Sequence, residues 1–457
     1  MADRTNDDRS ADQPGGGWST DGLGYLQNKV ALQRVYVFHP FVKGDKPTNL
    51  SRSPEARLEE ALGLAVAIRI DLVGGELAPL RTIRPATYLG QGKLDEIKEQ
   101  VKEQELDLLV FDCELTPIQQ RNLERALKVK VIDRTALILE IFGDRASTKE
   151  GELQVELAHL TYQRSRLVRS WTHLERQRGG SGFLGGPGET QIEADRRIIA
   201  DRITRIKKQL EAVTRTRTLH RSRRQKAPYP VVALVGYTNA GKSTLFNYLT
   251  KAEVMAEDML FATLDPTLRA IDMPSGRKII LSDTVGFISE LPTMLIAAFR
   301  ATLEEVLEAD VIIHVRDASH SDSDVQKQDV INVLAELGVD IEGAESGTPV
   351  IEALNKADML DVTALETLEA QAERHTKFIP LSGLTGYGCE RLIQAIDSLL
   401  GAKDKEIEKR VPYSDGATQS WLHANTKIVS EKHLEDGIHY SFIVDPIIWA
   451  KFEKKDR

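Results

Sequence analysis

Short apolar runs alternate with helical stretches in the first third of the chain. Residues 35–42 (VYVFHPFV), 106–112 (LDLLVFD) and 129–135 (VKVIDRT) are apolar runs of the kind found in buried parallel strands. Residues 53–73 form a helical stretch that runs into apolar positions. This alternation predicts a small α/β domain over residues 27–145.

The period of the apolar positions changes in the next stretch. Apolar residues recur at intervals of four and three, which keeps one side of a helix apolar. The Gly-rich segment from Gly179 to Gly188 interrupts the pattern, because glycine is costly inside a helix and Pro187 has no N–H. We therefore predict a hairpin of two long antiparallel helices over residues 146–227. The two seams are Leu153, Leu157, Leu160, Arg164, Leu167, Trp171 and Leu174, then Ile199, Ile203, Ile206, Leu210 and Val213.

The strand and helix pattern returns over residues 228–402. Five apolar runs (VVALVG, KIILSD, DVIIHVRD, PVIEALN and FIPLSG) are separated by helical stretches, which predicts a doubly wound, mainly parallel sheet. The charged segment AKDKEIEKRVP then predicts a linker to a small C-terminal domain within residues 403–457, where IHYSFIVD has a strand-like pattern. Residues 1–26 are rich in Asp, Ser and Gly and predict a disordered tail.

Composition limits the class of protein. The chain has 457 residues, enough for about three domains of ~150 residues each. Its 41% hydrophobic and 28% charged residues and net charge of −9 are ordinary for a globular protein and exclude a fibrous or wholly disordered chain. Cys113 and Cys389 match no disulfide or metal spacing. No apolar stretch approaches the ~20 residues of a membrane span, and the first residues have no apolar signal-peptide core. We therefore expect a cytoplasmic protein with no membrane partner.

A phosphate-binding pattern follows the VVALV run. Its spacing is G-x-x-x-x-G-K-S, between a predicted strand and a predicted helix. In such a loop backbone N–H groups point at phosphate oxygens, Lys242 neutralises the β and γ phosphates, and the Ser243 hydroxyl binds Mg²⁺. The alternative is a Gly-rich turn with a surface lysine. The predicted nucleotide-binding positions are Gly236, Tyr237, Thr238, Asn239, Ala240, Gly241, Lys242, Ser243 and Thr244.

A second motif ends the KIILS run. It consists of Asp283, Thr284, Val285 and Gly286. A carboxylate at the carboxyl edge of a parallel sheet lies where ligands bind in open α/β folds, so Asp283 is suited to a Mg²⁺ site. The backbone N–H of Gly286 can meet the γ phosphate. The next position, which holds a water-orienting Gln in Ras-like GTPases, is Phe287, and a phenyl ring cannot polarise water. We therefore expect slow intrinsic turnover, completed by a partner or by another side chain.

Two further segments of the predicted sheet indicate that the bound base is guanine. Asn355, Lys356, Ala357 and Asp358 end the PVIEAL run, and the Asp358 carboxylate can accept both N–H groups at N1 and N2 of guanine, which adenine lacks. A backbone N–H at Ser382 and Gly383 can meet the guanine O6. A polar turn or a helix start is the alternative for the Asn355–Asp358 segment. Together these motifs predict binding of GTP and GDP with Mg²⁺.

The loop before the KIILSD run is a candidate switch. It contains Phe261, Ala262, Thr263, Leu264 and Asp265. A threonine here can place its hydroxyl on Mg²⁺ and its N–H on the γ phosphate, so that loop order reports the nucleotide state. By position alone Thr263 and Thr267 both qualify, and an ordinary loop threonine remains the alternative.

The second predicted hairpin helix is strongly basic. From Arg196 to Lys226 twelve Lys or Arg residues stand against Asp201 and Glu211, a net charge of +10 in an acidic chain. Such a face suits the phosphate backbone of RNA, although a merely solvated helix face is the alternative. The Gly179–Gly188 loop suits close approach to RNA, or serves only as a hinge. Gly90, Gly92 and Lys93 match a lone G-x-G-K, which we interpret as a turn; ATP binding there has no other support.

With these motifs in place, the sequence resembles the HflX family of bacterial GTPases. The matching stretches are GYTNAGKSTLFN, FATLDPT, DTVGFI, NKAD, GELQVELAHLTY and RQRGGSGFLGGPGETQIEADRR, the last two lying outside the GTPase domain. The resemblance implies that Thr263, rather than Thr267, is the switch threonine and that an apolar Phe287 conforms to the family. At Ser382–Gly383 the family more often has Ser-Ala.

The resemblance also implies a partner and a role. Family members associate with the large ribosomal subunit and are implicated in splitting stalled ribosomes or in subunit maturation. We expect a Mg²⁺-dependent GTPase that docks on rRNA through the hairpin and the Gly179–Gly188 loop. Catalysis is assigned to Lys242, Thr263 and Gly286, and metal binding to Ser243, Thr263 and Asp283. The alternative is a regulatory GTPase that acts on a protein partner without RNA. The sequence carries no signal for oligomeric state, and a monomer is the default expectation.

Overall fold

The structure of the protein is a computed structural model. It describes residues 33–44, 52–68, 70–177, 187–224, 229–251, 260–261, 263–264, 266–292, 295, 303, 305–339, 348–375, 377–402, 404–434, 436–444, 449 and 452–453. The predicted tail of residues 1–26, most of the Gly179–Gly188 loop, Ala262 and Asp265 lie outside these residues. Among the described residues, no helix is both long and apolar enough to cross a bilayer.

The N-terminal part is an α/β layer, as its apolar runs predict. Four parallel strands lie in the order β2-β1-β3-β4. The prediction of one helical stretch over residues 53–73 is wrong at its end, because α1 stops at Val66 and a strand begins at Asp71. This strand is mostly half-buried and contains Gly74 and Gly75, so it lacks a continuous apolar run. The elements are β1 (Arg34–Val42), α1 (Pro54–Val66), β2 (Asp71–Leu80), α2 (Gln91–Glu103), β3 (Leu108–Phe111), α3 (Pro117–Leu127), β4 (Lys130–Asp133) and α4 (Arg134–Arg145).

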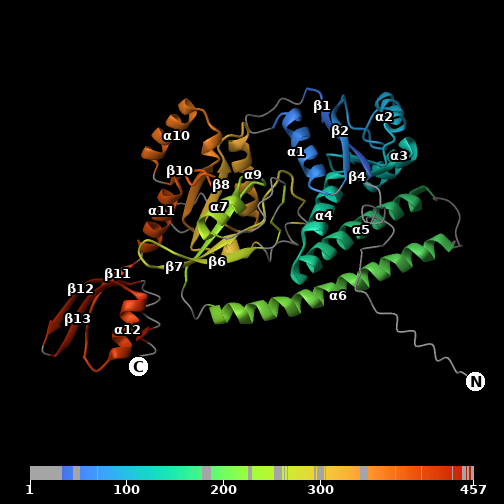
Figure 1. Ribbon diagram of the computed structural model, residues 1–457. Helices are drawn as coiled ribbons and strands as arrows, with labels where there is room; N and C mark the ends of the chain where they lie inside the picture. The colour runs from blue at the N-terminus through green and yellow to red at the C-terminus, as the bar shows by residue number, and fades with distance from the viewer. Residues whose placement is uncertain are drawn as a thin grey trace, which may run out of the picture.

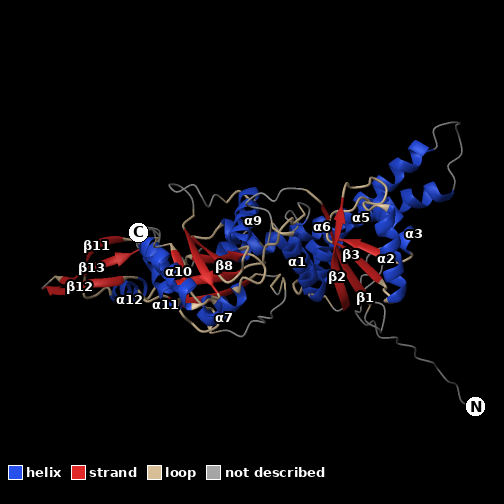
Figure 2. Ribbon diagram, turned by 90° about the horizontal axis from the view of Figure 1, so that it is seen from above, coloured by secondary structure: helices blue, strands red, loops and turns tan. Residues whose placement is uncertain are grey.

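Two long helices follow, α5 (Lys149–Gln177) and α6 (Pro187–Arg224). They run side by side in opposite directions (Figures 1 and 2). On α6 the predicted seam is correct at its centre, since Ile203 and Ile206 are buried. Pro187 and Gly188 belong to the first turn of α6, which shortens the predicted loop; proline is favoured there because its missing N–H has no helical partner anyway.

The burial of α5 is wider than its predicted seam. Leu153 is buried, but Leu157 and Leu160 are only half-buried. Instead Val155, Ala158 and Tyr162 are buried, because α5 also packs against α3 and α4. The Tyr162 hydroxyl donates to Asp133 Oδ1 at 2.8 Å. The hairpin is therefore fixed to the N-terminal layer along α5.

The third part confirms the predicted doubly wound sheet. Its strand order is β10-β9-β8-β5-β7-β6. The five predicted strands are parallel, and an unpredicted edge strand, β6, runs antiparallel to β7. The elements are β5 (Val231–Gly236), α7 (Lys242–Thr250), β6 (Thr267–Asp272), β7 (Lys278–Asp283), β8 (Val311–Asp317), α9 (Ser323–Glu336), β9 (Val350–Asn355), η2 (Ala357–Met359), α10 (Val362–Arg374), β10 (Phe378–Pro380) and α11 (Cys389–Gly401).

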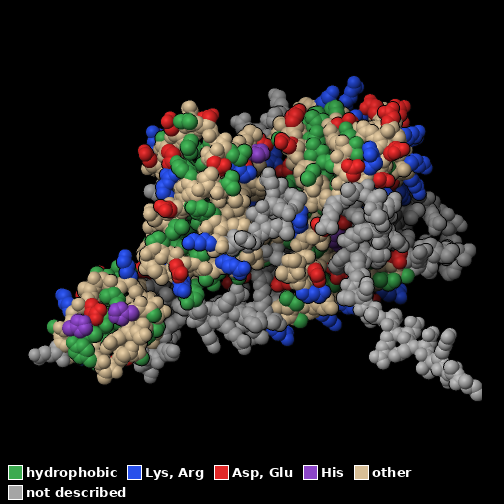
Figure 3. Space-filling model, viewed as in Figure 1, with side chains coloured by type: hydrophobic (Ala, Val, Ile, Leu, Met, Phe, Trp, Pro, Cys, Tyr) green, Lys and Arg blue, Asp and Glu red, His purple; other side chains and the backbone are tan. Residues whose placement is uncertain are grey.

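The C-terminal part is a small antiparallel sheet in the order β11-β13-β12. Its first strand occupies the segment that the charge pattern predicts as a linker, so that prediction is wrong. Ile407 and Val411 turn toward the core there, while Glu406, Glu408 and Arg410 are exposed. Histidines gather on the outside of this part (Figure 3). The elements are β11 (Lys405–Val411), α12 (Gly416–Asn425), β12 (Lys427–Leu434) and β13 (Gly437–Val444).

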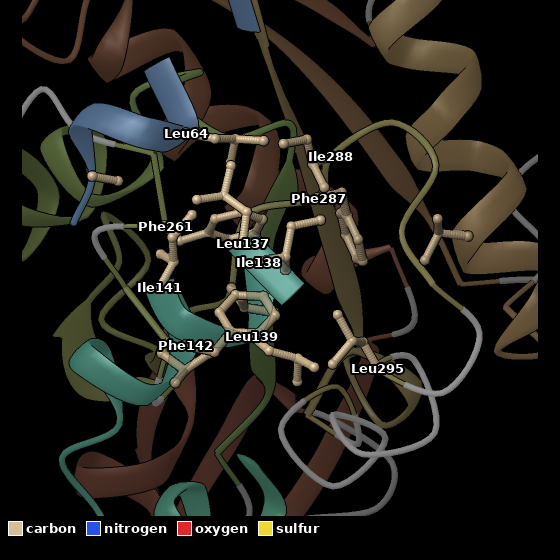
Figure 4. Packing of buried hydrophobic residues seen from close by; sticks show 14 of the residues in the cluster. Leu64, Leu137, Ile138, Leu139, Ile141, Phe142, Phe261, Phe287, Ile288 and Leu295 are labelled. Atoms are coloured by element: carbon tan, nitrogen blue, oxygen red, sulfur yellow. The ribbon is translucent and has the colours of Figure 1, made fainter. Parts of the chain in front are cut away.

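The N-terminal and central sheets lie side by side, and α6 passes along both (Figure 1). One hydrophobic cluster joins them. It contains Leu64, Leu137 and Phe142 from the N-terminal layer together with Phe261 and Phe287 from the central part. Figure 4 shows these side chains pointing toward one another from the two parts. We call this cluster the shared core.

Candidate nucleotide-binding site

The phosphate-binding pattern forms the predicted turn between β5 and α7. Gly241 is the N-cap of α7 and has φ +84°, which L side chains rarely adopt. A Cβ at this position would also lie 2.3 Å from Asn355 Nδ2. The N-terminus of α7 therefore opens on a loop in which only glycine fits, the geometry that offers backbone N–H groups to phosphate.

Lys242 lies within this loop. Its ammonium donates to the carbonyl oxygens of Tyr237 (2.8 Å) and Gly236 (3.2 Å). Burial lowers the pKa of Lys242 to about 8, although the Asp283 carboxylate acts in the opposite direction. A buried ammonium with such a depressed pKa favours any anion that reaches it.

Three predicted metal ligands meet beside the loop. The Ser243 hydroxyl donates to Asp283 Oδ2 at 2.7 Å, and the Thr263 hydroxyl lies 3.0 Å from the same oxygen. The two hydroxyl oxygens are 2.8 Å apart. Burial raises the pKa of Asp283, against the opposing effects of Lys242 and both hydroxyls.

This cluster fits Mg²⁺. Asp283 Oδ1 is buried and has no hydrogen-bond partner among the described residues. All of the donors are hard oxygens, the ligands that Mg²⁺ prefers. Thr267 starts β6 opposite Asp283 in the ladder, but Thr263 is the threonine whose hydroxyl lies on the carboxylate.

The guanine motifs lie where β9 and β10 end. Asn355 Nδ2 donates to Ala240 O at 2.8 Å, and its Oδ1 accepts from the Gly383 N–H at 2.9 Å. Asn355 thus ties the phosphate loop to the Ser382–Gly383 segment. The Gly383 N–H, which we expected to face guanine O6, is engaged by this side chain.

Asp317 and Leu381 hold the rest of the Asn355–Asp358 segment in place. Lys356 forms an ion pair with Asp317 at 2.7 Å, and the Ala357 N–H donates to Leu381 O at 3.1 Å. Asp358 lies in η2 and is exposed. Its carboxylate is therefore accessible to a ligand at this edge of the sheet.

Several predicted positions face the shared core instead of the loop. Phe261, Leu264 and Val285 are buried within it. The ring of Phe261 packs edge-on against Phe142, with centroids 4.7 Å apart. Thr284 is also buried and donates to Leu234 O at 2.6 Å. Phe261, Leu264 and Val285 therefore connect the candidate switch segments to the N-terminal layer.

The segment after Gly286 lies along the phosphate loop. The Thr238 N–H donates to Phe287 O at 2.7 Å, and the Phe287 N–H donates to Gly236 O at 3.1 Å. The Phe287 side chain is 1% exposed and points into the shared core (Figure 4). This orientation agrees with the expectation that Phe287 does not orient water.

A polar network that sequence reasoning missed borders the same segment. The Tyr237 hydroxyl donates to Glu60 on α1 and accepts from the Ser289 N–H at 2.7 Å. Arg134 bridges Asp112 and Glu60 and donates to Ser289 O at 3.0 Å. Burial alone would raise the pKa of Glu60, but the charges of Arg134 and Arg52 hold it below its ordinary value. Apart from Tyr237, which lies in the phosphate loop, no local motif marks these residues.

The lone G-x-G-K forms a helix start. Gly90 is the N-cap of α2, and Lys93 is paired with Glu76 at 2.8 Å and Glu96 at 3.1 Å. The lysine is therefore neutralised by carboxylates. The segment is therefore the start of a helix rather than the plain turn that we expected.

A phosphate loop after β5, an oxygen-rich acidic cluster beside it and an Asn-Lys-Ala-Asp segment after β9, on a doubly wound sheet, define a P-loop GTPase. Three family models match the chain: "GTP-binding GTPase N-terminal" over residues 55–143, "GTP-binding GTPase Middle Region" over 145–224 and "50S ribosome-binding GTPase" over 231–356. The chain belongs to the HflX family of GTPases.

Individual relatives cover most of the chain. It is 50% identical to GTPase HflX of Magnetococcus marinus over 379 residues, 83% of this chain and 86% of the relative. It is 44% identical to GTPase HflX of Escherichia coli over 431 residues, 93% and 97% of the two chains. It is also similar to a crystal structure of a GTP-binding protein from Sulfolobus solfataricus in complex with GDP, with 27% identity, coverage of 80% and 98%, and a TM-score of 0.43.

Proposed function

We propose that this GTPase binds the large ribosomal subunit through the α5–α6 hairpin and couples its GTP state to ribosome splitting or to subunit maturation. The observation that carries the proposal is the shared core. It joins the segments that border the phosphate loop to the same N-terminal layer that holds α5. A change at the loop can therefore reach the hairpin through packed side chains.

In the proposed nucleotide site, Lys242 neutralises the β and γ phosphates and the Gly286 N–H meets the γ phosphate. Ser243, Thr263 and Asp283 hold Mg²⁺, which when bound offsets phosphate charge. Asp358 selects guanine, and Asn355 keeps the phosphate loop in register with Ser382 and Gly383. GTP and GDP then differ in whether Thr263 and Gly286 have a γ phosphate to contact.

The route to the hairpin begins at two buried aromatic residues. Phe261, two positions before Thr263, packs on Phe142 of α4, and Phe287, next to Gly286, lies in the same cluster. α4 in turn contacts α5. Packed elements of this kind shift between discrete arrangements, so we infer that a γ phosphate sets the orientation of the hairpin.

The exposed face of α6 supports an RNA partner. Arg202 pairs with Glu156 of α5, so this arginine also fastens the hairpin. The remaining cations are open to solvent, and neutralising phosphates with them would release counterions. The exposed basic side chains described on α6 are Arg196, Arg197, Arg202, Arg205, Lys207, Lys208 and Arg215.

We also propose a division of labour along the chain. Residues 27–145 transmit the nucleotide state, 146–227 dock, 228–402 bind and hydrolyse GTP, and 403–457 form a separate folded part. We propose that the protein acts as a monomer in the cytoplasm.

The test is GTP turnover with and without purified large subunits at two salt concentrations. We expect subunits to raise turnover, with a smaller effect at high salt because the contact is ionic. The triple variant R196E/R197E/R205E should lose co-sedimentation with subunits while retaining GDP binding. Arg202 is left intact because reversing it would also break its pair with Glu156.

A matched control is K405E/K427E/K432E, which makes the same charge change on exposed positions of the C-terminal sheet. We expect this control to co-sediment as the wild type does. Equal loss of co-sedimentation in both triple variants would show a general effect of charge. If large subunits do not change GTP turnover at either salt concentration, the result would favour a switch that acts on a protein partner without RNA.

A further inference from the structure

The GTPase chemistry needs a group that orients the attacking water, and Phe287 cannot supply it. Its side chain is buried in the shared core, and its backbone is held by Gly236 and by Thr238. The water-orienting group must therefore come from another side chain of the site or from a partner. One source is a polar side chain of the phosphate loop that has no structural hydrogen bond.

Thr238 has such a side chain. It is 5% exposed, and its hydroxyl is buried with no hydrogen-bond partner among the described residues. A buried hydroxyl without a partner is destabilising, so such a group in a native protein commonly serves function. Thr284, which is also buried, differs because its hydroxyl donates to Leu234 O.

The position of Thr238 places it beside the expected γ phosphate. A Cβ built on Gly286 would lie 2.8 Å from the methyl carbon Cγ2 of Thr238 and 3.0 Å from Lys242 Nζ, so the methyl group faces Gly286 and the hydroxyl reaches a γ phosphate there by rotation about the Cα–Cβ bond. Thr238, Gly286 and Lys242 therefore converge on one small volume. The backbone of Thr238 is fixed there, because its N–H donates to Phe287 O.

We propose that Thr238 is a catalytic residue whose hydroxyl orients the attacking water in place of the missing glutamine. The hydroxyl has one donor and two acceptor sites, so it can accept from the water and donate to a γ-phosphate oxygen at the same time. The water oxygen forms a bond to the γ phosphorus, and the bond from that phosphorus to the β–γ bridging oxygen breaks. GDP leaves with the bridging oxygen, and the water proton passes to the phosphate and then to solvent. Thr238 ends the step with its own proton.

The proposal rests on the nucleotide site described above, and its test separates the two. The variant Thr238→Val keeps the shape and removes the hydroxyl, whereas Thr238→Ser keeps the hydroxyl. We expect Thr238→Val to lower the single-turnover rate of GTP hydrolysis by about tenfold or more, with GDP affinity within about twofold of wild type. Thr238→Ser should remain within about threefold of the wild-type rate. If the wild type itself does not bind GDP, that result would instead contradict the nucleotide site.

A second readout needs no nucleotide. Thr238→Val removes an unpaired buried polar group, so its melting temperature without nucleotide should equal or exceed that of the wild type. The comparison variant for stability is Thr284→Val, whose buried hydroxyl donates to Leu234 O at 2.6 Å, so that its loss should lower the melting temperature. Thr250→Val on α7, whose hydroxyl donates to Phe246 O at 2.7 Å, is the control for hydrolysis and should turn over GTP at the wild-type rate.

Three results would overturn the proposal. The first is an unchanged hydrolysis rate in Thr238→Val, and the second is a rate in Thr238→Ser as low as in Thr238→Val, which would assign the effect to packing. The third is a melting temperature of Thr238→Val that falls as far as that of Thr284→Val, since the Thr238 hydroxyl would then have a structural partner. Should Thr238→Val not fold, Thr238→Ala compared with Thr238→Ser decides the same question.

Discussion

The Tyr237 hydroxyl accepts a hydrogen bond from the Ser289 N–H at 2.7 Å, which fastens the phosphate loop to the segment after Gly286. The same hydroxyl donates to Glu60, a residue of the N-terminal layer 177 positions away in sequence. Three separate segments therefore meet at one phenol. A displacement of any one of them changes the environment of the other two.

Replacing Tyr237 by Phe should destabilise the protein. The change leaves the buried Ser289 N–H without its acceptor and removes a donor from Glu60, which costs about 1–3 kcal/mol in the free energy of unfolding. Urea unfolding measures it. Tyr229→Phe, at a residue that is 44% exposed, serves as the control and should be neutral. Equal stability of both variants would contradict the role of this phenol.

Glu60 should make the folded state sensitive to acid. Its pKa is below the ordinary 4.5, because Arg134 and Arg52 outweigh burial. The ionised carboxylate therefore stabilises the fold above pH 4.5, and this contribution is lost as pH falls through the lowered pKa. We expect Glu60→Gln to be less stable than wild type at pH 7, with the difference narrowing below pH 4.5 in urea titrations. Glu59 is exposed on the same helix, and the stability difference between Glu59→Gln and wild type should not narrow in this way. A stability difference between Glu60→Gln and wild type that stays constant with pH would refute the linkage.

Local pattern was sufficient to predict most of the central sheet and which of its loops meet at the candidate nucleotide site. The ligands come from short segments at strand ends, and parallel strands bring those ends to one edge whatever the rest of the chain does. Asp283, Ser243 and Thr263 therefore meet as expected. The strands that the pattern missed in the N-terminal and central sheets, β2 and β6, are mostly half-buried or exposed and have no continuous apolar run.

Long-range contacts could not be predicted from the sequence. Glu60 lies in an ordinary amphipathic helix, and nothing near it indicates that its carboxylate contacts a phosphate-loop tyrosine. The same holds for Phe287, whose type excludes water orientation but does not reveal its packing. The charged strand β11 was mistaken for a linker because its two inward apolar residues are separated by exposed charges.

Asp358→Asn should change base selectivity. Its exposed carboxylate can accept two guanine N–H groups, whereas an amide presents one donor where an acceptor is needed. We expect GTP affinity to fall by about a hundredfold or more, and affinity for xanthosine triphosphate to rise because xanthine carries an oxygen at C2. Competition with a fluorescent nucleotide measures both. Glu366→Gln, exposed on α10, should leave the preference intact. An unaltered preference in Asp358→Asn would remove Asp358 from the guanine site.

Lys242 should link nucleotide binding to proton uptake. Burial lowers its pKa to about 8, so above that pH much of the free protein carries a neutral amine. Phosphate oxygens favour the ammonium form and raise the pKa in the complex, so binding takes up a proton and the affinity for GTP falls as pH rises above about 8. Calorimetry at pH 9 in two buffers of different ionisation enthalpy should detect this uptake, and the same experiment at pH 7 should show little of it. Lys251→Met, at the end of α7, provides the matched control and should retain the full uptake. Equal proton uptake at pH 7 and pH 9 would mean that Lys242 is already charged in the free protein and that its burial does not govern binding.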